Sequence, residues 1–158
     1  MRRAAYRLFW FLHPHAIRLS GGRFGWRVRG QDVLELEHVG RRSGALRRNF
    51  LYYQRDGENL LVVASNIGDA RNPEWLKNLL VHAETHVSRA GDRRAVHARV
   101  ATAEERARLW PQLTARNPAY ADYARLTERE IPIVILEPPG ATRQRMRPDE
   151  SLLHRIKR

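Results

Sequence analysis

The sequence contains no cysteine, only two lysines among its 29 basic residues, and no long apolar run. The absence of cysteine excludes a disulfide framework and thiol catalysis, and it fits a reducing compartment. The apolar runs, among them residues 60–64 and 131–136, are far shorter than the roughly 20 residues of a membrane-spanning helix. We therefore expect a cytoplasmic protein, and its 158 residues suit one compact domain.

Several common catalytic motifs are also absent. Ser43 lies in a Gly-x-x-Ser-Gly pattern, whereas the nucleophile of a serine hydrolase needs Gly-x-Ser-x-Gly. His82 and His86 resemble a zinc motif, but the intervening glutamate is misplaced and the pair straddles the end of a predicted helix, so we predict no metal site. There is no dinucleotide-binding glycine motif and no Walker loop, which disfavours a Rossmann domain and an NTPase.

The net charge of +12 is concentrated at the two ends of the chain. Residues 1–30 carry seven arginines and no acidic residue, giving +7, while residues 139–158 carry six basic and two acidic residues, giving +4. Clustered cations attract anionic partners such as membrane headgroups, nucleic acid or a polyanionic cofactor. A solvated surface that only aids solubility would have the same composition.

Residues 2–13 have the pattern of an amphipathic helix. Tyr6, Phe9, Trp10 and His13 recur at spacings of three and four, with arginines along their flank. Such a helix can lie in the interface of an anionic membrane, or pack on the protein's own core. The first reading predicts a peripheral location on the inner membrane face.

Runs of strand-forming residues between turn residues predict antiparallel strands at 33–39, 46–53, 60–65, 85–88 and 95–100, the first of them with clear alternation of apolar and polar residues. The continuous apolar run at 131–136 predicts a further, buried strand. Helix patterns are at 72–82, with Asn72 as its cap, at 102–114, with a capping box, and from 117 onward. Hairpins with interspersed helices, and no regular βαβ alternation, predict an α+β fold around a small antiparallel barrel. We divide the chain into a basic helix and loop at 1–30, a barrel domain at 31–138 and a basic tail at 139–158.

The turn at residues 40–44 is the strongest candidate for a binding site. Arg41, Arg42, Ser43, Arg47 and Arg48 place four guanidinium groups and a hydroxyl within eight residues. A turn of this kind offers backbone N–H groups and bidentate donors to a phosphate. Strand alternation sends Arg47 and Arg48 to opposite faces, so only part of the cluster can meet one ligand. A solvated charged turn is the alternative.

An ordered set of short motifs extends over residues 32–138. It includes Gly40-Arg-Arg-Ser-Gly-Ala-Leu-Arg47, Leu51-Tyr-Tyr53, Leu61-Val-Val-Ala-Ser65, Asn72-Pro-Glu-Trp75, Pro118-Ala-Tyr120 and Ile131-Pro-Ile-Val-Ile-Leu-Glu-Pro138. This set resembles the deazaflavin-dependent nitroreductase and quinone reductase family. The resemblance implies a split β-barrel of the FMN-binding type. It also implies an oxidoreductase that passes a hydride from reduced coenzyme F-420 to a quinone, a nitroaromatic or another electrophilic acceptor.

The resemblance also implies roles for individual residues. Those expected to hold the cofactor, its phosphate or its glutamate tail are Arg41, Arg42, Ser43, Arg47, Tyr52, Ser65, Asn66 and Trp75. Those expected on the acceptor side are Asn117, Tyr120 and Tyr123. The cofactor supplies the hydride, so the protein needs positioning, exclusion of water and a proton donor. We assign the proton donor to Tyr120 and polarisation of the acceptor to Ser65.

Four positions depart from the family pattern: Phe50, Ile67, Leu76 and Asn117. They leave open which acceptor is used and whether the cofactor is F-420 or FMN. Two other functions also remain open. One is a nucleic-acid-binding or other polyanion-binding barrel, although the aromatic residues do not interleave with basic ones as stacking platforms require. The other is a barrel that binds FMN or haem without turnover. The sequence does not predict the oligomeric state.

Overall fold

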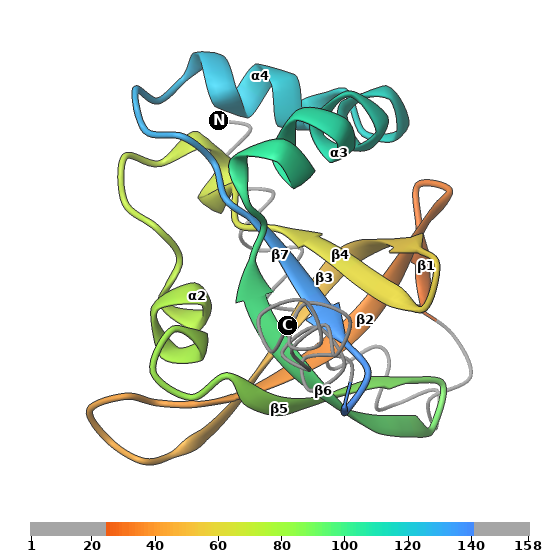
Figure 1. Cartoon of the computed structure of the whole chain (residues 1–158), viewed down its shortest axis with the longest axis vertical. Helices are drawn as coiled ribbons and strands as arrows, with labels where there is room; N and C mark the ends of the chain where they lie inside the picture. The colour runs from red at the N-terminus through yellow and green to blue at the C-terminus, as the bar shows by residue number, and fades with distance from the viewer. Residues whose placement is uncertain (1–24, 141–158) are drawn as a thin grey trace, which may run out of the picture.

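Seven antiparallel strands form one sheet in the computed structural model of the chain, which describes residues 25–140 (Figure 1). The strands are β1 (Arg27–Val28), β2 (Gln31–Val39), β3 (Leu46–Asp56), β4 (Asn59–Val63), β5 (Glu84–Arg89), β6 (Asp92–Val100) and β7 (Ile133–Glu137). The helices are the 3-10 turn η1 (Asn66–Gly68), α2 (Glu74–Leu79), α3 (Ala103–Arg116) and α4 (Ala119–Arg125). The predicted amphipathic helix at 2–13 and nearly all of the predicted tail lie outside the described residues.

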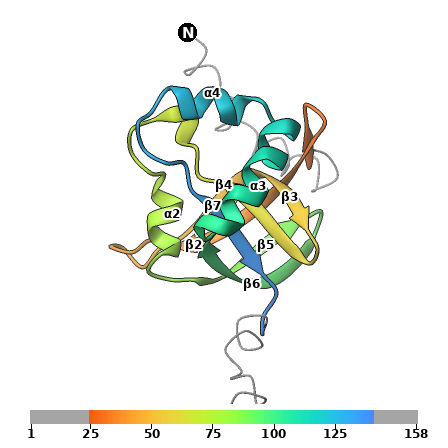
Figure 2. The ribbon, with the colours of Figure 1, turned by 45° about the horizontal axis from the view of Figure 1, so that its top comes forward.

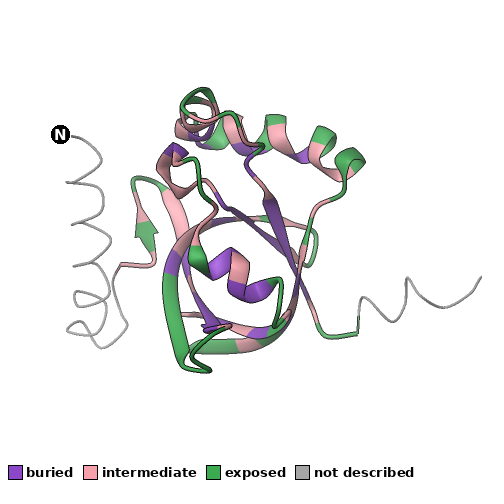
Figure 3. Cartoon of the chain, turned by 90° about the vertical axis from the view of Figure 1, so that its left-hand side faces the viewer, coloured by how far each residue is buried: buried purple, intermediate pink, exposed green. Residues whose placement is uncertain are grey.

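The sheet closes into a barrel of six strands. Its order is β1-β2-β3-β4-β7-β6-β5, and an extra pairing of β2 with β5 joins the two sides. That pairing sets Glu35 opposite Ser88 and Leu36 opposite Val87. Apolar side chains from the strands fill the interior, and α2 adds Trp75, Leu76 and Leu79 to the same cluster. Figure 3 shows α2 carrying buried residues where it packs at one end of the barrel.

Strands β4 and β7 are buried on both faces. Their inward residues belong to the barrel core, while Leu61, Val63, Ile133 and Ile135 pack in a second cluster with α3 and α4. Figures 1 and 2 both show these two helices over the same side of the barrel as β4 and β7. Burial on both faces explains why the sequence has uninterrupted apolar runs here instead of alternation.

The α3 end of the barrel is fixed by a short ionic network. Thr102 caps α3 and forms a capping box with Glu105, as predicted. Arg99 on β6 donates to both carboxylate oxygens of Glu105 at 2.6 and 2.7 Å, and to Glu137 on β7 at 2.8 Å. The cap of the helix is therefore tied directly to two strands of the barrel.

One side of β3 remains open over half of its length. β3 pairs with β2 from Leu46 to Tyr52, and β4 pairs with β3 only from Tyr53 to Asp56. In the described part of the chain, the residues of β3 before Tyr53 therefore have a strand partner on one side only. This is the split of the barrel.

The predicted α+β fold with a split barrel is confirmed, and three local details differ. The strand β1 lies inside the segment 1–30 that we predicted as helix and loop, and it pairs with β2. Asn72 does not cap α2: its side chain accepts from Arg129, and Pro73 occupies the cap position. The helix also ends at Leu79 rather than near residue 82, because Leu80 begins a turn toward β5.

Candidate cofactor pocket

A pocket of about 810 Å³ lies at the split of the barrel. One wall is formed by β3 from Arg47 to Tyr52, and the opposite wall by the segment from Val63 to Trp75. Lys77 of α2 and Tyr120 of α4 also line it, as does His38 of β2. The volume is within the range of small-molecule and cofactor sites.

The lining combines aromatic and cationic side chains. Its aromatic residues are Phe50, Tyr52, Trp75 and Tyr120, and its cationic residues are Arg47, Arg48, Arg71 and Lys77. Flat aromatic rings suit a planar heterocycle, and guanidinium and ammonium groups suit phosphate and carboxylate oxygens. The pocket therefore has the donors that a phosphorylated, carboxylate-bearing deazaflavin would need.

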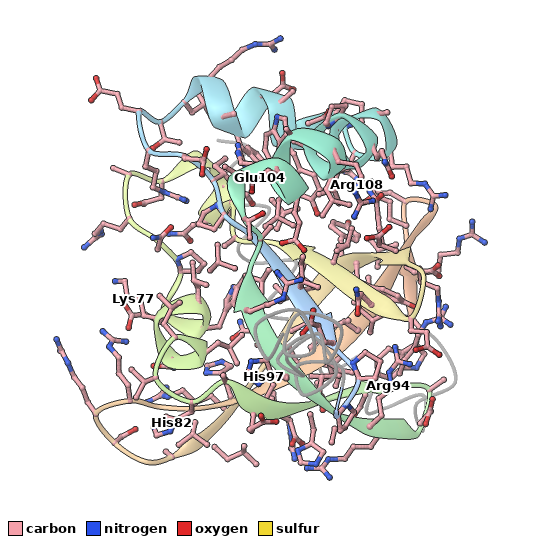
Figure 4. All side chains as sticks on the ribbon, viewed as in Figure 1. Lys77, His82, Arg94, His97, Glu104 and Arg108 are labelled. Atoms are coloured by element: carbon pink, nitrogen blue, oxygen red, sulfur yellow. The ribbon has the colours of Figure 1, made fainter. Side chains whose placement is uncertain are left out.

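The four cations differ in how far they are already neutralised. Arg48 is paired with Glu37 at 3.3 Å and with Glu35 at 3.4 Å. Lys77, on the outer side of α2 in Figure 4, is paired with Glu74 at 2.7 Å. Arg71 lies 3.7 Å from Asp69.

Arg47 is the exception. Its guanidinium makes no ion pair with any residue between 25 and 140, although it lines the pocket. It is therefore the pocket cation with the most capacity for an anionic ligand.

The carboxylate that holds Arg48 is almost fully buried on the outer face of the barrel. Glu37 accepts from Arg93 Nη2 at 2.8 Å and from Arg48 Nη2 at 3.3 Å, and His86 Nδ1 lies 3.9 Å away. The hydrogen bond from Arg93 is the main reason why the pKa of Glu37 is lowered from its usual range, and Arg48 adds to the effect. This ionic cluster fixes Arg48 in place and reduces its capacity for a ligand.

The segment after β4 has an unusual backbone. Asn66 and Ile67 both have positive φ, at 46° and 56°, which is costly for a residue other than glycine and most of all for a β-branched one. Gly68 also has positive φ, and a Cβ there would lie 2.9 Å from Leu126 Cβ and Tyr123 O. Ile67 thus enters the pocket lining because the segment bends sharply against α4.

Arg129 holds this segment in position. It donates to the backbone oxygens of Asp69 at 2.9 Å, Ser65 at 2.9 Å and Ala64 at 3.2 Å, and to Asn72 Oδ1 at 2.8 Å. Burial lowers the pKa of its guanidinium group. A single side chain therefore secures one wall of the pocket.

The turn at 40–44 packs against α2. Asn78 Oδ1 accepts from Arg41 N at 3.1 Å and from Arg41 Nη1 at 3.2 Å, and Arg41 Nη1 is also paired with Glu74. Hydrogen bonds from Lys77, first, and from Arg41 lower the pKa of Glu74 to about 2. Ser43 Oγ accepts from Ala45 N, and a side chain at Gly40 would place Cβ 2.6 Å from that Oγ. The backbone N–H of Arg41 and part of its guanidinium group are thus engaged within the fold.

The structure brings together part of the predicted site. The predicted residues that line the pocket are Arg47, Tyr52, Ser65, Asn66, Trp75 and Tyr120. Those outside its lining are Arg41, Arg42, Ser43, Asn117 and Tyr123. Asn117 is a buried residue at the junction of α3 and α4, where its backbone oxygen accepts from Tyr120 N at 3.0 Å. The roles of all these residues stay predictions.

Sequence reasoning missed several lining residues. Asn49 shares a face of β3 with Arg47, and Lys77 is one helical turn after Glu74, so alternation and helical spacing could have indicated both. His38 could have been found as the cross-strand partner of Arg47. No local signal pointed to Arg71.

A six-stranded split barrel with an aromatic and cationic pocket at the split defines a cofactor-binding protein of the flavin-binding barrel class. The sequence profile of the F420H(2)-dependent quinone reductases matches residues 10–138. The chain belongs to this family, which confirms the family and the fold predicted from the sequence.

Two curated relatives and one solved structure agree with the assignment. A Mycobacterium tuberculosis protein that is provisionally named an F420H(2)-dependent quinone reductase is 47% identical over 112 residues, covering 67% of this chain and 89% of the relative. A second protein of that organism, named an F420H(2)-dependent quinone reductase, is 35% identical over 130 residues, covering 79% and 87%. The solved structure of an F420-H2 dependent reductase, FDR-A, is 28% identical with a TM-score of 0.61, over 66% of this chain and 93% of that one.

No helix within residues 25–140 has the length and apolar character needed to cross a bilayer. Within the same residues, no three histidine, aspartate or glutamate side chains gather in a way that could hold a metal ion.

Proposed function

We propose that this chain binds reduced coenzyme F-420 in the pocket at the split and reduces a quinone there. Membership of the family makes the chain an oxidoreductase that depends on this deazaflavin. The observation that carries the site assignment is Arg47, a pocket guanidinium without an ionic partner among the described residues, next to a wall of aromatic rings. When bound, the cofactor supplies the hydride.

The residues of the pocket would bind the cofactor, exclude water and set the spacing of the two walls. Arg47, with Arg71 and Lys77 at the rim, would hold the phosphate and the carboxylates of the cofactor. Trp75 is nearly buried and would exclude water from the space that the ring would occupy. Phe50 packs with Trp26 and Val33, on the face of β3 opposite Arg47. The rigid strand β3 and the segment held by Arg129 set the distance between the two walls.

Tyr120 would deliver the proton. It lines the pocket from α4 while 94% of its surface is buried, so a proton moved at its hydroxyl would be shielded from bulk water. Ser65 also lines the pocket, and its backbone oxygen accepts from Arg129 and from Gly68 N. Its hydroxyl would polarise the acceptor oxygen.

The first experiment titrates the pure protein with F-420 and with FMN by fluorescence, and then adds menadione to the reduced cofactor. Binding of F-420 followed by oxidation of its reduced form supports the proposal. Binding of FMN alone would indicate a flavin-dependent protein with the same fold. Binding of neither cofactor, or binding without any transfer to menadione, would contradict it.

The second experiment separates the pocket from the turn. Arg47→Met should weaken F-420 binding by roughly 10- to 100-fold, because a charged hydrogen bond is lost. Arg42→Met is the matched control, since Arg42 is exposed and outside the pocket lining. An equal loss of F-420 affinity in both variants would indicate that the turn at 40–44 takes part in binding the phosphate.

A third experiment tests the proton donor. Tyr120→Phe should lower turnover by about a hundredfold and leave cofactor affinity unchanged, because only the hydroxyl is removed. Tyr53→Phe, a buried tyrosine of the barrel core outside the pocket, is the control. Full activity of the Tyr120 variant would remove its assignment.

We also propose that the protein rests on an anionic membrane surface, where a lipid-soluble quinone can be reached. The support within the described residues is three exposed apolar side chains, Leu46 at 57%, Leu80 at 65% and Val81 at 59%, beside the arginines of the turn that packs on α2. The predicted N-terminal helix lies outside the described residues. Pelleting of the full-length chain with anionic liposomes, compared with neutral ones, tests the proposal, and equal pelleting would contradict it.

A further inference from the structure

A chain of side-chain amides and one imidazole runs beneath the pocket. Asn78 Nδ2 lies 2.9 Å from His38 Nδ1, and His38 Nε2 lies 2.8 Å from Asn49 Oδ1. His38 is only 3% exposed, and it connects α2 to the face of β3 that carries Arg47 and Asn49. The orientation of Asn49 is therefore set by groups that lie deeper in the fold.

The direction of each hydrogen bond follows from one unambiguous donor. The backbone N–H of Arg41 can only donate, so the atom of Asn78 that it contacts is the oxygen. The amide nitrogen of Asn78 then points at His38 Nδ1, which must accept. A neutral imidazole that accepts at Nδ1 carries its proton on Nε2, and that N–H donates to Asn49 Oδ1. Burial lowers the pKa of His38 most, and Arg47 contributes, which favours this neutral ring.

The amide nitrogen of Asn49 is left as a hydrogen-bond donor. Its oxygen is occupied by His38, while its Nδ2 has no acceptor among residues 25–140, and Asn49 is an exposed residue of the pocket lining. Arg47, two residues earlier on the same face of β3, also has no ionic partner in that range. Two unoccupied donors therefore lie next to each other on one strand face, one charged and one neutral.

We infer that the Asn49 amide, oriented by His38, donates to the phosphate of the cofactor beside Arg47. The inference rests on the proposed function and adds a binding residue to it. The pairing of an arginine with a fixed amide donor suits a tetrahedral anion, which offers several oxygens to separate donors. His38 acts through Asn49, and it is a positioning residue.

The test measures equilibrium binding, without turnover. Dissociation constants are determined by fluorescence for F-420 and for the deazaflavin riboside that lacks the phosphate and the glutamate chain. Asn49→Ala should weaken F-420 binding roughly tenfold, and Asn49→Asp roughly a hundredfold, because it adds a negative charge where a donor is lost. Neither variant should change binding of the riboside. Asn59→Asp, on the β3–β4 hairpin outside the pocket, is the matched control and should bind as the wild type does.

The outcomes separate the two proposals. A wild-type protein that binds neither ligand contradicts the proposed function and this inference with it. A wild type that binds F-420, together with Asn49 variants of unchanged affinity, overturns this inference alone. Equal losses for F-420 and the riboside would assign Asn49 to the ring instead of the phosphate, and they would overturn it as well.

Two NMR measurements on the folded wild type test the positioning role directly. The ring nitrogens of His38 should show the Nε2–H tautomer in the cofactor-free protein. The side-chain NH2 signals of Asn49 should shift when F-420 is added and stay in place when the riboside is added. An Nδ1–H tautomer, or NH2 signals indifferent to F-420, would overturn the inference.

Discussion

Removing the Arg129 side chain should loosen one complete wall of the pocket. Four of its hydrogen bonds, between 2.8 and 3.2 Å, hold the backbone oxygens of Ala64, Ser65 and Asp69 and the side chain of Asn72. Hydrogen bonds from a charged donor contribute about 1.5 to 3 kcal/mol each, but water can reach parts of this segment and replace some of them. We therefore expect Arg129→Met to lower the free energy of unfolding by about 3 kcal/mol, at the low end for breaking a partly buried charged network.

The assay is thermal unfolding followed by circular dichroism, with cofactor binding measured in parallel. For a chain of this length about 3 kcal/mol corresponds to a decrease in Tm of roughly 6 to 12 °C. Arg125→Met is the control, because Arg125 is exposed and, among residues 25–140, its one ion pair is with the exposed Asp122 of its own helix. F-420 binding of the Arg129 variant, measured well below its Tm, should also weaken. A Tm no lower than that of the control would refute this account of the segment.

Three further changes test other parts of the fold. Ala90 precedes Gly91 in the β5–β6 turn with φ at 51°, so Ala90→Asn should raise the free energy of unfolding by about 0.5 to 1 kcal/mol, measured in urea, without affecting turnover. Arg93 lowers the pKa of Glu37, so the contribution of this carboxylate to stability is complete above pH 4.5 and is lost as the pH falls through the folded pKa. Glu37→Gln should therefore be less stable than the wild type at pH 7, and its free energy of unfolding, measured in urea, should fall less steeply as the pH is lowered. An equally steep fall in both proteins would contradict this. Thr102→Ala removes the cap of α3 and should cost about 1 kcal/mol by the same measurement, whereas no change would show that the cap is dispensable.

The parts of the fold that depend on neighbouring residues could be predicted from the sequence. Alternation located the strands, and the Thr102–Glu105 spacing located the start of α3, because both signals arise within a few residues. The continuous apolar run at 131–136 was correctly interpreted as a buried strand, although the helices that cover it could only be seen in the structure.

The candidate site was harder to predict because its contacts join distant segments. Alternation assigned Arg47 and Arg48 to opposite faces of β3, but it could not show that Glu37 neutralises Arg48. The sequence suggested Arg41 as a phosphate ligand, yet its backbone N–H donates to the side-chain oxygen of Asn78, 37 residues later. Asn72 had the pattern of a helix cap and was instead taken by Arg129, 57 residues away. Competition between local and distant partners decided each of these cases.

An unpaired strand edge is also a hazard, since it can recruit a strand from another molecule and start aggregation. In this barrel Arg47 and Arg48 directly follow Leu46, the first residue of the exposed stretch of β3, and repulsion between like charges would oppose a second copy docking there. The cations of the proposed phosphate site would therefore also oppose pairing of two copies along this edge.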